Sequence, residues 1–554
     1  MRLFTHAEVR TFDPANPIAR AILVSQGTVL AVGEVRELRD LAGDTVPVEE
    51  IDCRGTTIIP GLVDAHLHAS MYADTLADID LRVVRSEAEA VEAIRAYAQD
   101  LPAGVWVTGG RWDSNTWDRP VQPDRALLDS ALPDRPVAVW SIDYHTLWCN
   151  AAALRAAGIE DDSPSPRGGE IVRDAHGRTT GILREDAATL VERVIPVLPL
   201  EVRTARMKRA QDAWLAEGLT GLHDIDGAAS RETWEALREA GEQRLRVVKY
   251  LRLEEFDWAK RTGWRTGDGD DWYLQGGLKL FSDGALGSHT SYMSSPFPHA
   301  EGEDPNFGIQ IATEDVLREQ IVDALDHGIA LAVHAIGDRA NQHVLSAFAA
   351  TADRTTQAER SFGRPLRHRI EHAQFLRPAD VARFAELGIV ASMQPRHCIS
   401  DLHLLDRLRP DPALAAYAWG DLARAGATVA FGSDGPVEPS NPFAAIYAAM
   451  TRADISGDPS TTFQPERRIS AYAAIEAHSA GAAYAAGRET RTGRIAAGMN
   501  ADFLVLDHDP LSGDGYDGTT GEAASEQALF EHAIRVRDTR PLMTVVAGQV
   551  AHSR

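Results

Sequence analysis

Cysteine is scarce in this sequence, with three residues among 554. Cys53, Cys149 and Cys398 lie far apart, and no two of them form a CxxC pair. This spacing indicates neither a disulfide framework nor a zinc ribbon. We therefore expect the three thiols to be buried as small hydrophobic side chains.

Long hydrophobic runs and excess positive charge are also missing. No segment reaches the eighteen or so apolar residues that a membrane helix requires, and residues 1–10 lack the apolar stretch of a signal peptide. The 56 lysines and arginines are outnumbered by 81 aspartates and glutamates, which gives a formal net charge of −25. Nucleic acids and anionic membranes attract basic patches, so neither is expected as a partner. We expect a cytoplasmic protein whose charge serves solubility.

What the chain does contain is a repeated unit of a short β-branched run, a turn and a helical stretch. This alternation predicts a parallel sheet. The first strand starts at residue 58 and leads into His66-Leu67-His68, and seven more are predicted at 219–224, 245–251, 277–281, 329–334, 368–372, 389–393 and 428–431. Eight strands with helical crossovers are typical of a (β/α)₈ TIM-type barrel. A doubly wound sheet would favour a glycine-rich first turn, which this chain lacks.

The remaining segments predict additions to the barrel. Residues from about 72 to 200 are too many for one barrel connection, and we interpret them as an insertion over the barrel mouth. Both chain ends alternate apolar and polar residues with glycine turns, at 21–32, 501–506 and 542–550. We predict that they meet in a small composite β-sandwich. The expected domains are 1–57 and 489–554 for the sandwich and 58–488 for the barrel with its insertion.

Polar residues at the ends of the predicted strands indicate a metal site. His66 and His68 are spaced i, i+2, which places both imidazoles on one face of a strand, and imidazole is a common metal ligand. In this fold the carboxyl ends of the strands carry the chemistry. The full set of candidate ligands is His66, His68, Lys279, His334, His372 and Asp434. Four imidazoles and a carboxylate exceed what one tetrahedral Zn²⁺ with an open position uses, so two ions are an alternative to one.

Lys279 needs a separate interpretation because an ammonium group cannot bind a cation. Its carbamate, formed with CO₂, is a carboxylate that could bridge two ions. The competing interpretation is that Lys279 neutralises Asp283 or Asp434.

The ordered ligand set resembles the amidohydrolase superfamily over nearly the whole chain. The segments 61–68, 279–288, 334–340, 370–372 and 432–434 are similar to the branch that contains N-substituted formamide deformylases. The resemblance implies a barrel, a composite β-sandwich and a hydrolase acting on C–N bonds other than peptide bonds.

The resemblance also implies roles for individual residues. His66, His68 and Asp434 would hold the more buried ion, His334 and His372 the more exposed one, and carbamylated Lys279 would bridge them. Zn²⁺ is the expected ion, with other divalent metals left open. Asp434 would be the catalytic residue, acting as general base and then general acid with metal-activated hydroxide. In a one-ion site, Lys279 could stay an ammonium.

Four residues are weaker candidates for substrate binding. His145 and Glu185 lie in the predicted insertion; His145 could instead belong to a packed aromatic loop, and Glu185 could instead orient a ligand. Asp338 and Arg339 follow His334 and could contact substrate, or could pair with each other at a helix start.

Three functions remain open from the sequence. The first is hydrolysis of an N-formyl or N-acyl amine, with a small-molecule amide as the partner. The second is deamination or cyclic amide opening on the same scaffold, and Lys279 counts against deamination. The third is a regulatory protein with a structural metal site. A homodimer is a common default for such chains, although no segment indicates an interface.

Overall fold

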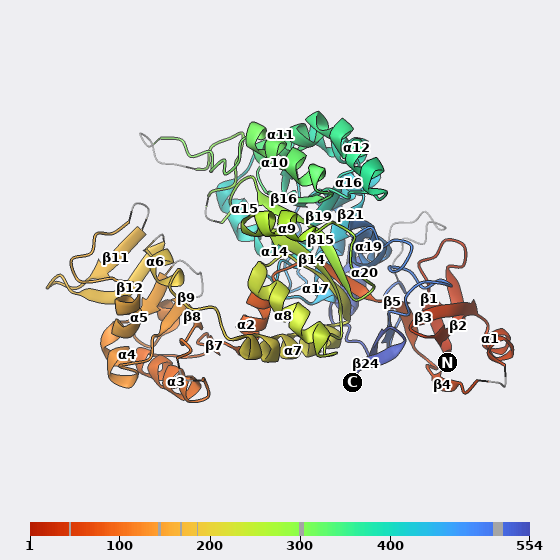
Figure 1. The fold of residues 1–554 in the computed structure, drawn as a ribbon, viewed down its shortest axis with the longest axis horizontal. Helices are drawn as coiled ribbons and strands as arrows, with labels where there is room; N and C mark the ends of the chain where they lie inside the picture. The colour runs from red at the N-terminus through yellow and green to blue at the C-terminus, as the bar shows by residue number, and fades with distance from the viewer. Residues whose placement is uncertain are drawn as a thin grey trace. The chain divides into compact units, whose positions relative to one another are not determined.

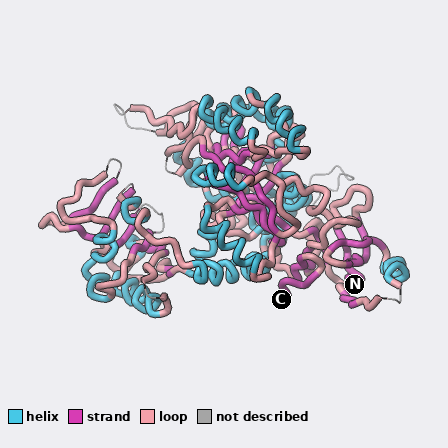
Figure 2. Tube along the Cα trace, in the orientation of Figure 1, coloured by secondary structure: helices cyan, strands magenta, loops and turns pink. Residues whose placement is uncertain are grey.

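The structure, a computed structural model, describes residues 1–43, 46–102, 104–141, 146–166, 169–185, 187–287, 289–298, 304–513 and 525–554, without the side chains of Asn115 and Glu185. These residues form two compact units. One unit combines Met1–Ala69 with Ala210–Arg554, and the other is Ser70–Arg209. Figures 1 and 2 show their helices and strands.

The larger unit contains a parallel sheet of eight strands in the order β21-β19-β17-β16-β15-β14-β13-β6. The strands are β6 (Leu62–Leu67), β13 (Leu219–Asp224), β14 (Arg246–Arg252), β15 (Tyr273–Phe281), β16 (Leu331–Ala335), β17 (Arg369–His372), β19 (Val390–Met393) and β21 (Val429–Phe431). The two edge strands meet, since Leu67 and Gly435 form a parallel bridge and the amide of Asp434 donates to His66 O at 2.7 Å. The sheet and its closure fit the predicted TIM-type barrel.

Helices alternate with most of the barrel strands along the chain. The main ones are α7 (Leu200–Glu217), α8 (Ala228–Glu239), α10 (Glu314–Asp326), α11 (Asp338–Ala350), α13 (Pro378–Leu387), α16 (Trp419–Arg424) and α17 (Pro442–Thr451). Local sequence sets their ends: Thr313 caps α10 by accepting from the amide of Val316, and α13 begins at Pro378. Short helices also lie at the mouth, among them α14 (Pro395–Ser400) and α15 (Leu402–Leu408).

The first predicted strand is two strands in the structure. β5 (Thr57–Pro60) pairs outside the barrel, and β6 starts the barrel after Gly61. A Cβ atom at Gly61 would lie 2.3 Å from Thr220 Oγ1, so this position accepts only glycine without a shift of β13. The chain therefore changes sheets between β5 and β6, a few residues before the histidine pair.

Strands from both chain ends form one sheet, in the order β24-β23-β22-β5-β1-β2-β3 with β4 beside β1. They are β1 (Arg2–Arg10), β2 (Ile18–Ser25), β3 (Thr28–Gly33), β4 (Glu49–Asp52), β5, β22 (Phe503–Leu506), β23 (Met543–Val546) and β24 (Gln549–Ser553). β5 and β22 are antiparallel partners, and the Phe4 and Phe503 rings meet edge to face, 4.8 Å apart. The chain ends thus share a sheet and a core, while a second sandwich layer stays a prediction.

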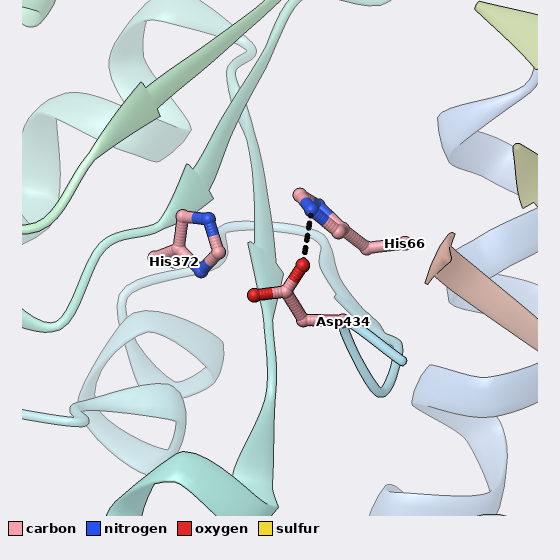
Figure 3. A group of neighbouring side chains, drawn as sticks. All are labelled: His66, His372 and Asp434. Atoms are coloured by element: carbon pink, nitrogen blue, oxygen red, sulfur yellow. Dashed lines mark ion pairs between the residues drawn. The ribbon is translucent and has the colours of Figure 1, made fainter. Parts of the chain in front are cut away.

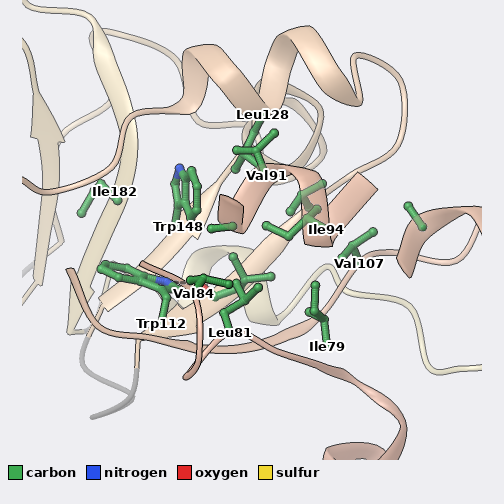
Figure 4. Packing of buried hydrophobic residues seen from close by; sticks show 14 of the residues in the cluster. Ile79, Leu81, Val84, Val91, Ile94, Val107, Trp112, Leu128, Trp148 and Ile182 are labelled. Atoms are coloured by element: carbon green, nitrogen blue, oxygen red, sulfur yellow. Dashed lines mark hydrogen bonds between the residues drawn. The ribbon is translucent and has the colours of Figure 1, made fainter. Parts of the chain in front are cut away.

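The smaller unit has its own sheet, in the order β11-β12-β10-β9-β8-β7, with α3 (Glu87–Gln99) and α4 (Arg125–Ala131) against its core. Its strands β11 (Gly169–Arg173) and β12 (Thr179–Glu185) form an antiparallel pair. Trp112 and Trp148 pack inside this core (Figure 4), and Trp117 is buried with them. Core packing therefore accounts for the tryptophans of this segment.

Cys53, Cys149 and Cys398 are buried and unpaired, as predicted. None of the described helices combines the length and the apolar character needed to cross a bilayer.

Candidate metal centre

Three buried side chains converge where the barrel strands end: His66 on β6, His372 at the end of β17 and Asp434 just after β21 (Figure 3). One potential ligand atom from each lies within 4.8 Å of the other two. His372 and Asp434 have positive φ angles, 72° and 60°, an uncommon conformation for residues other than glycine. Such strained backbone is typical of functional sites, where surrounding structure stabilises it.

Asp434 Oδ1 lies against two imidazole nitrogens. It is 3.2 Å from His66 Nε2 and 3.3 Å from His68 Nε2. The other nitrogen of each ring is already bonded, since His66 Nδ1 contacts the Glu371 carboxylate and His68 Nδ1 lies 2.7 Å from Asp226 Oδ1. With Nδ1 of each ring bonded to a carboxylate, both rings turn their Nε2 atoms toward the Asp434 oxygen. A divalent cation between these nitrogen and oxygen atoms fits this arrangement.

Orphaned nitrogens support the same fit to a metal ion. Among the described residues, His66 Nε2 and His372 Nδ1 are buried nitrogens without a hydrogen-bond partner. Buried polar atoms normally have partners, so each exception calls for an explanation such as a bound ion. The residues present therefore fit a divalent cation held by imidazole nitrogen and carboxylate oxygen.

A buried network supports these ligands from inside the barrel. The guanidinium of Arg369 binds the Glu371 carboxylate and donates to His223 Nδ1 at 2.9 Å and to Tyr250 Oη at 3.1 Å. It also donates to Ala65 O and to Ser392 Oγ. Arg369 on β17 thus contacts four other strands and fixes the Glu371 carboxylate, which orients His66.

A second support orients the loop after β21. Asp64 accepts hydrogen bonds from the amides of His66 and Ser433, both at 3.0 Å, and from Ser433 Oγ at 2.5 Å. Burial raises the pKa of Asp64 to about 7, although these hydrogen bonds act to lower it. Asp434 is therefore placed by residues of β6 itself.

Lys279 and His334 are buried as well. Lys279 is 1% exposed, and its Nζ is 5.1 Å from the centre of the Phe281 ring. Burial lowers the pKa of Lys279 to about 8, although Glu371 and Asp434 act in the opposite direction. Asp283, one partner proposed from the sequence, accepts instead from the amides of Tyr292, Ile336 and Gly337.

His334 packs on His372, with ring centres 4.5 Å apart, while its Nε2 faces Gly284 O at 3.1 Å. Burial lowers the pKa of His334 to about 3 and that of His372 well below its ordinary value, so both rings are neutral.

Burial also opposes charge on His68 and Asp434. For His68, bonds to Asp226 and Asp434 outweigh it and raise the pKa to about 9. For Asp434, the imidazoles of His66, His397 and His68 outweigh it and hold the pKa well below its usual range.

Asp338 and Arg339, two of the predicted substrate-binding residues, do not belong to the group of converging ligand atoms. Asp338 is buried and accepts from the amide of Ser294, whereas the Arg339 guanidinium lies over the Tyr292 and Phe307 rings. These neighbours form no ion pair with each other in the described part of the chain. His145 and the Glu185 side chain lie outside the described residues.

Three polar residues of the site were not predicted from the sequence. Asp226 lies two residues past β13, Glu371 is on β17, and His397 is on α14, just beyond β19. His397 Nε2 lies 3.2 Å from Asp434 Oδ2. A sequence signal existed for each, because all three lie at or just after the carboxyl end of a predicted strand.

A TIM-type barrel whose strand ends present buried histidine and aspartate ligands defines a metal-dependent hydrolase. The chain belongs to the amidohydrolase family, because the model of the "Amidohydrolase family" matches residues 49–552.

Relatives extend over most of the chain. "Putative amidohydrolase YtcJ" of Bacillus subtilis is 32% identical, over 89% of this chain and 92% of its own length. "N-substituted formamide deformylase" of Arthrobacter pascens is 28% identical, over 95% and 96%. Among solved structures, an uncharacterized metal-dependent hydrolase from Pyrococcus furiosus has a TM-score of 0.76 and 26% identity, over 92% of this chain and 99% of that chain.

Proposed function

We propose that this protein hydrolyses the C–N bond of an N-formyl or N-acyl amine. The observation that carries the proposal is the position of Asp434 Oδ1 beside the Nε2 atoms of His66 and His68. The similarity to an N-substituted formamide deformylase along nearly the whole chain favours a linear, formyl-like substrate.

In this proposal His66, His68 and Asp434 would hold the more buried ion, and His334 and His372 would hold the more exposed one. A bound divalent cation supplies Lewis-acid activation of a water molecule and of the substrate carbonyl. Asp434 is the general base: it removes a proton from the attacking water and returns it to the departing nitrogen. The C–N bond breaks, a C–O bond forms, and the products are a carboxylic acid and an amine.

The proposal includes Zn²⁺ and a carbamate on Lys279. Imidazole nitrogen with carboxylate oxygen is a donor set that suits Zn²⁺. Lys279 is nearly fully buried, and its charge acts on the same carboxylates that hold the ligand histidines. A carbamate there replaces an ammonium with a carboxylate, which two cations could share.

Activity on a substrate panel tests the proposal. Protein grown with zinc should release formate or acid from N-formyl and N-acyl amines faster than it opens cyclic imides or deaminates aminopurines. Asp434→Asn should lower kcat by about 100- to 10,000-fold, the usual contribution of a general base. Turnover of aminopurines alone would replace the proposal with a deaminase, and full activity of Asp434→Asn would exclude the assigned base.

Metal content and intact mass test the number of ions and the carbamate on Lys279. We expect two ions per chain and an intact mass raised by one CO₂ under non-denaturing conditions. Lys279→Ala should then lose the added mass and at least one ion. One ion with an unmodified lysine would contradict the carbamate while leaving hydrolysis in place.

A further inference from the structure

His397 is a buried histidine next to the proposed general base. It lies on α14, which begins two residues after β19 ends, and is 8% exposed. Its Nε2 is 3.2 Å from Asp434 Oδ2, and its ring centre is 5.9 Å from that of His372. His397 is thus in direct contact with the site without belonging to the group of converging ligand atoms.

The two oxygens of Asp434 have different surroundings. Oδ1 faces the Nε2 atoms of His66 and His68, whereas Oδ2 faces His397. An ionised carboxylate only accepts hydrogen bonds, so the contact places a proton on His397 Nε2. His397 thus contacts a different oxygen of Asp434 from the one that faces the ligand imidazoles of His66 and His68. The Asp434 carboxylate therefore accepts a hydrogen bond from His397 at Oδ2, while Oδ1 faces the nitrogens of the candidate ligands His66 and His68.

A second contact joins the same two segments of chain. Arg396 Nε donates to Glu438 Oε2 at 2.8 Å, and both side chains are largely buried. Glu438 lies four residues after Asp434, and Arg396 immediately precedes His397. Two adjacent residues of α14 thus contact the loop after β21 at two points. The position of His397 relative to Asp434 is therefore fixed by the fold.

We infer that His397 is a positioning residue for Asp434. Its Nε2–H donates to Oδ2 and prevents rotation of the carboxylate, so that Oδ1 keeps its place against the ligand imidazoles. Without this donor, the side chain of Asp434 can turn, and the base no longer meets the water it deprotonates. This inference rests on the proposed hydrolysis for its effect on turnover, but its effect on ligand geometry does not depend on any substrate.

Two variants of similar size separate the hydrogen bond from packing. His397→Gln keeps an N–H donor near the position of Nε2, and His397→Leu removes it while filling the space. We expect His397→Leu to lower kcat by about 10- to 100-fold with little change in KM or metal content, the usual effect of losing a partner of a metal ligand. His397→Gln should recover most of kcat. His403→Leu, at an exposed position of the following helix α15, is the control.

A readout without substrate completes the test. The visible spectrum of the Co²⁺-loaded protein reports ligand geometry, and it should change in His397→Leu but remain close to wild type in His397→Gln. Equal kcat and spectra in wild type and His397→Leu would overturn the inference, as would loss of the ion in His397→Leu, which would make His397 a ligand. If the wild type hydrolyses no amide, the proposed function fails, and the spectra alone decide the role of His397.

Discussion

Glu371 is the residue that connects the barrel interior to the candidate metal centre. One of its oxygens contacts His66 Nδ1, and the other accepts from Arg369. All three side chains are fully buried. Burial opposes the charge of Glu371, but Arg369 outweighs it and holds the pKa well below its ordinary value, so the group is ionised. An ionised acceptor fixes the proton of His66 on Nδ1 and makes Nε2 the better ligand.

Replacing Glu371 should therefore weaken metal binding without removing a ligand. We expect Glu371→Gln to reduce metal affinity by about 10- to 100-fold, measured by competition with a chelator. Asp226→Asn should act in the same way through His68, whose Nδ1 contacts Asp226. Glu386→Gln, on the exposed face of α13, is the matched control. Unchanged affinity in both buried variants would show that these carboxylates do not orient the ligands.

The strands could be predicted from the sequence, because most barrel strands are short apolar runs between turns. All eight predicted strands occur within a few residues of their predicted positions. The break at Gly61 was not predicted, since a continuous apolar run does not reveal that its two halves pair in different sheets.

Side-chain partners were harder to predict than strands. Ligands at strand ends follow from the fold, but the Arg369–Glu371–His66 chain depends on which side chains point inward across several strands. His397 depends on the path of a helix after its strand. Such contacts are set by three-dimensional packing, which periodicity does not specify.

The junction of β21 with β6 is the element on which the site depends most. Gly432 comes so close to β6 that an added Cβ would lie 2.4 Å from His66 N and 2.7 Å from Asp64 Oδ1. Neither atom can move without shifting His66 or breaking the bonds of Asp64 to Ser433. Close approach of these two strands is what brings Asp434 to the imidazoles.

A methyl group at this junction should separate the strands. Gly432→Ala is expected to lower the free energy of unfolding by about 1–3 kcal/mol, as overpacking does, and to lower the bound metal per chain. Urea unfolding and metal analysis measure the two effects. Gly33→Ala adds the same atom where the nearest neighbour, Glu37 Oε2, is 3.5 Å away, and it should leave both values unchanged. Normal metal content in Gly432→Ala would mean that the junction tolerates a wider spacing.

At the scale of the whole molecule, the sheet of both chain ends is joined to the barrel that carries the site. β5 leads into β6 through a single residue, and Arg246 of β14 donates to Asp502 Oδ1, next to β22, at 2.9 Å. Thr544 of β23 donates to Leu215 O of α7 at 2.7 Å. Contacts at several points indicate that the sheet and the barrel unfold together.

Loss of packing inside this sheet should therefore destabilise the metal site as well. Phe503 is fully buried against Phe4, and Phe503→Ala is expected to lower the free energy of unfolding by about 3–5 kcal/mol. If sheet and barrel form one cooperative unit, metal release and the loss of circular dichroism should shift together to lower urea concentration. Val550→Ala on β24, where the side chain is 39% exposed, should shift neither transition. A variant that loses the sheet signal first and keeps its metal to the wild-type midpoint would show that the barrel holds the site by itself.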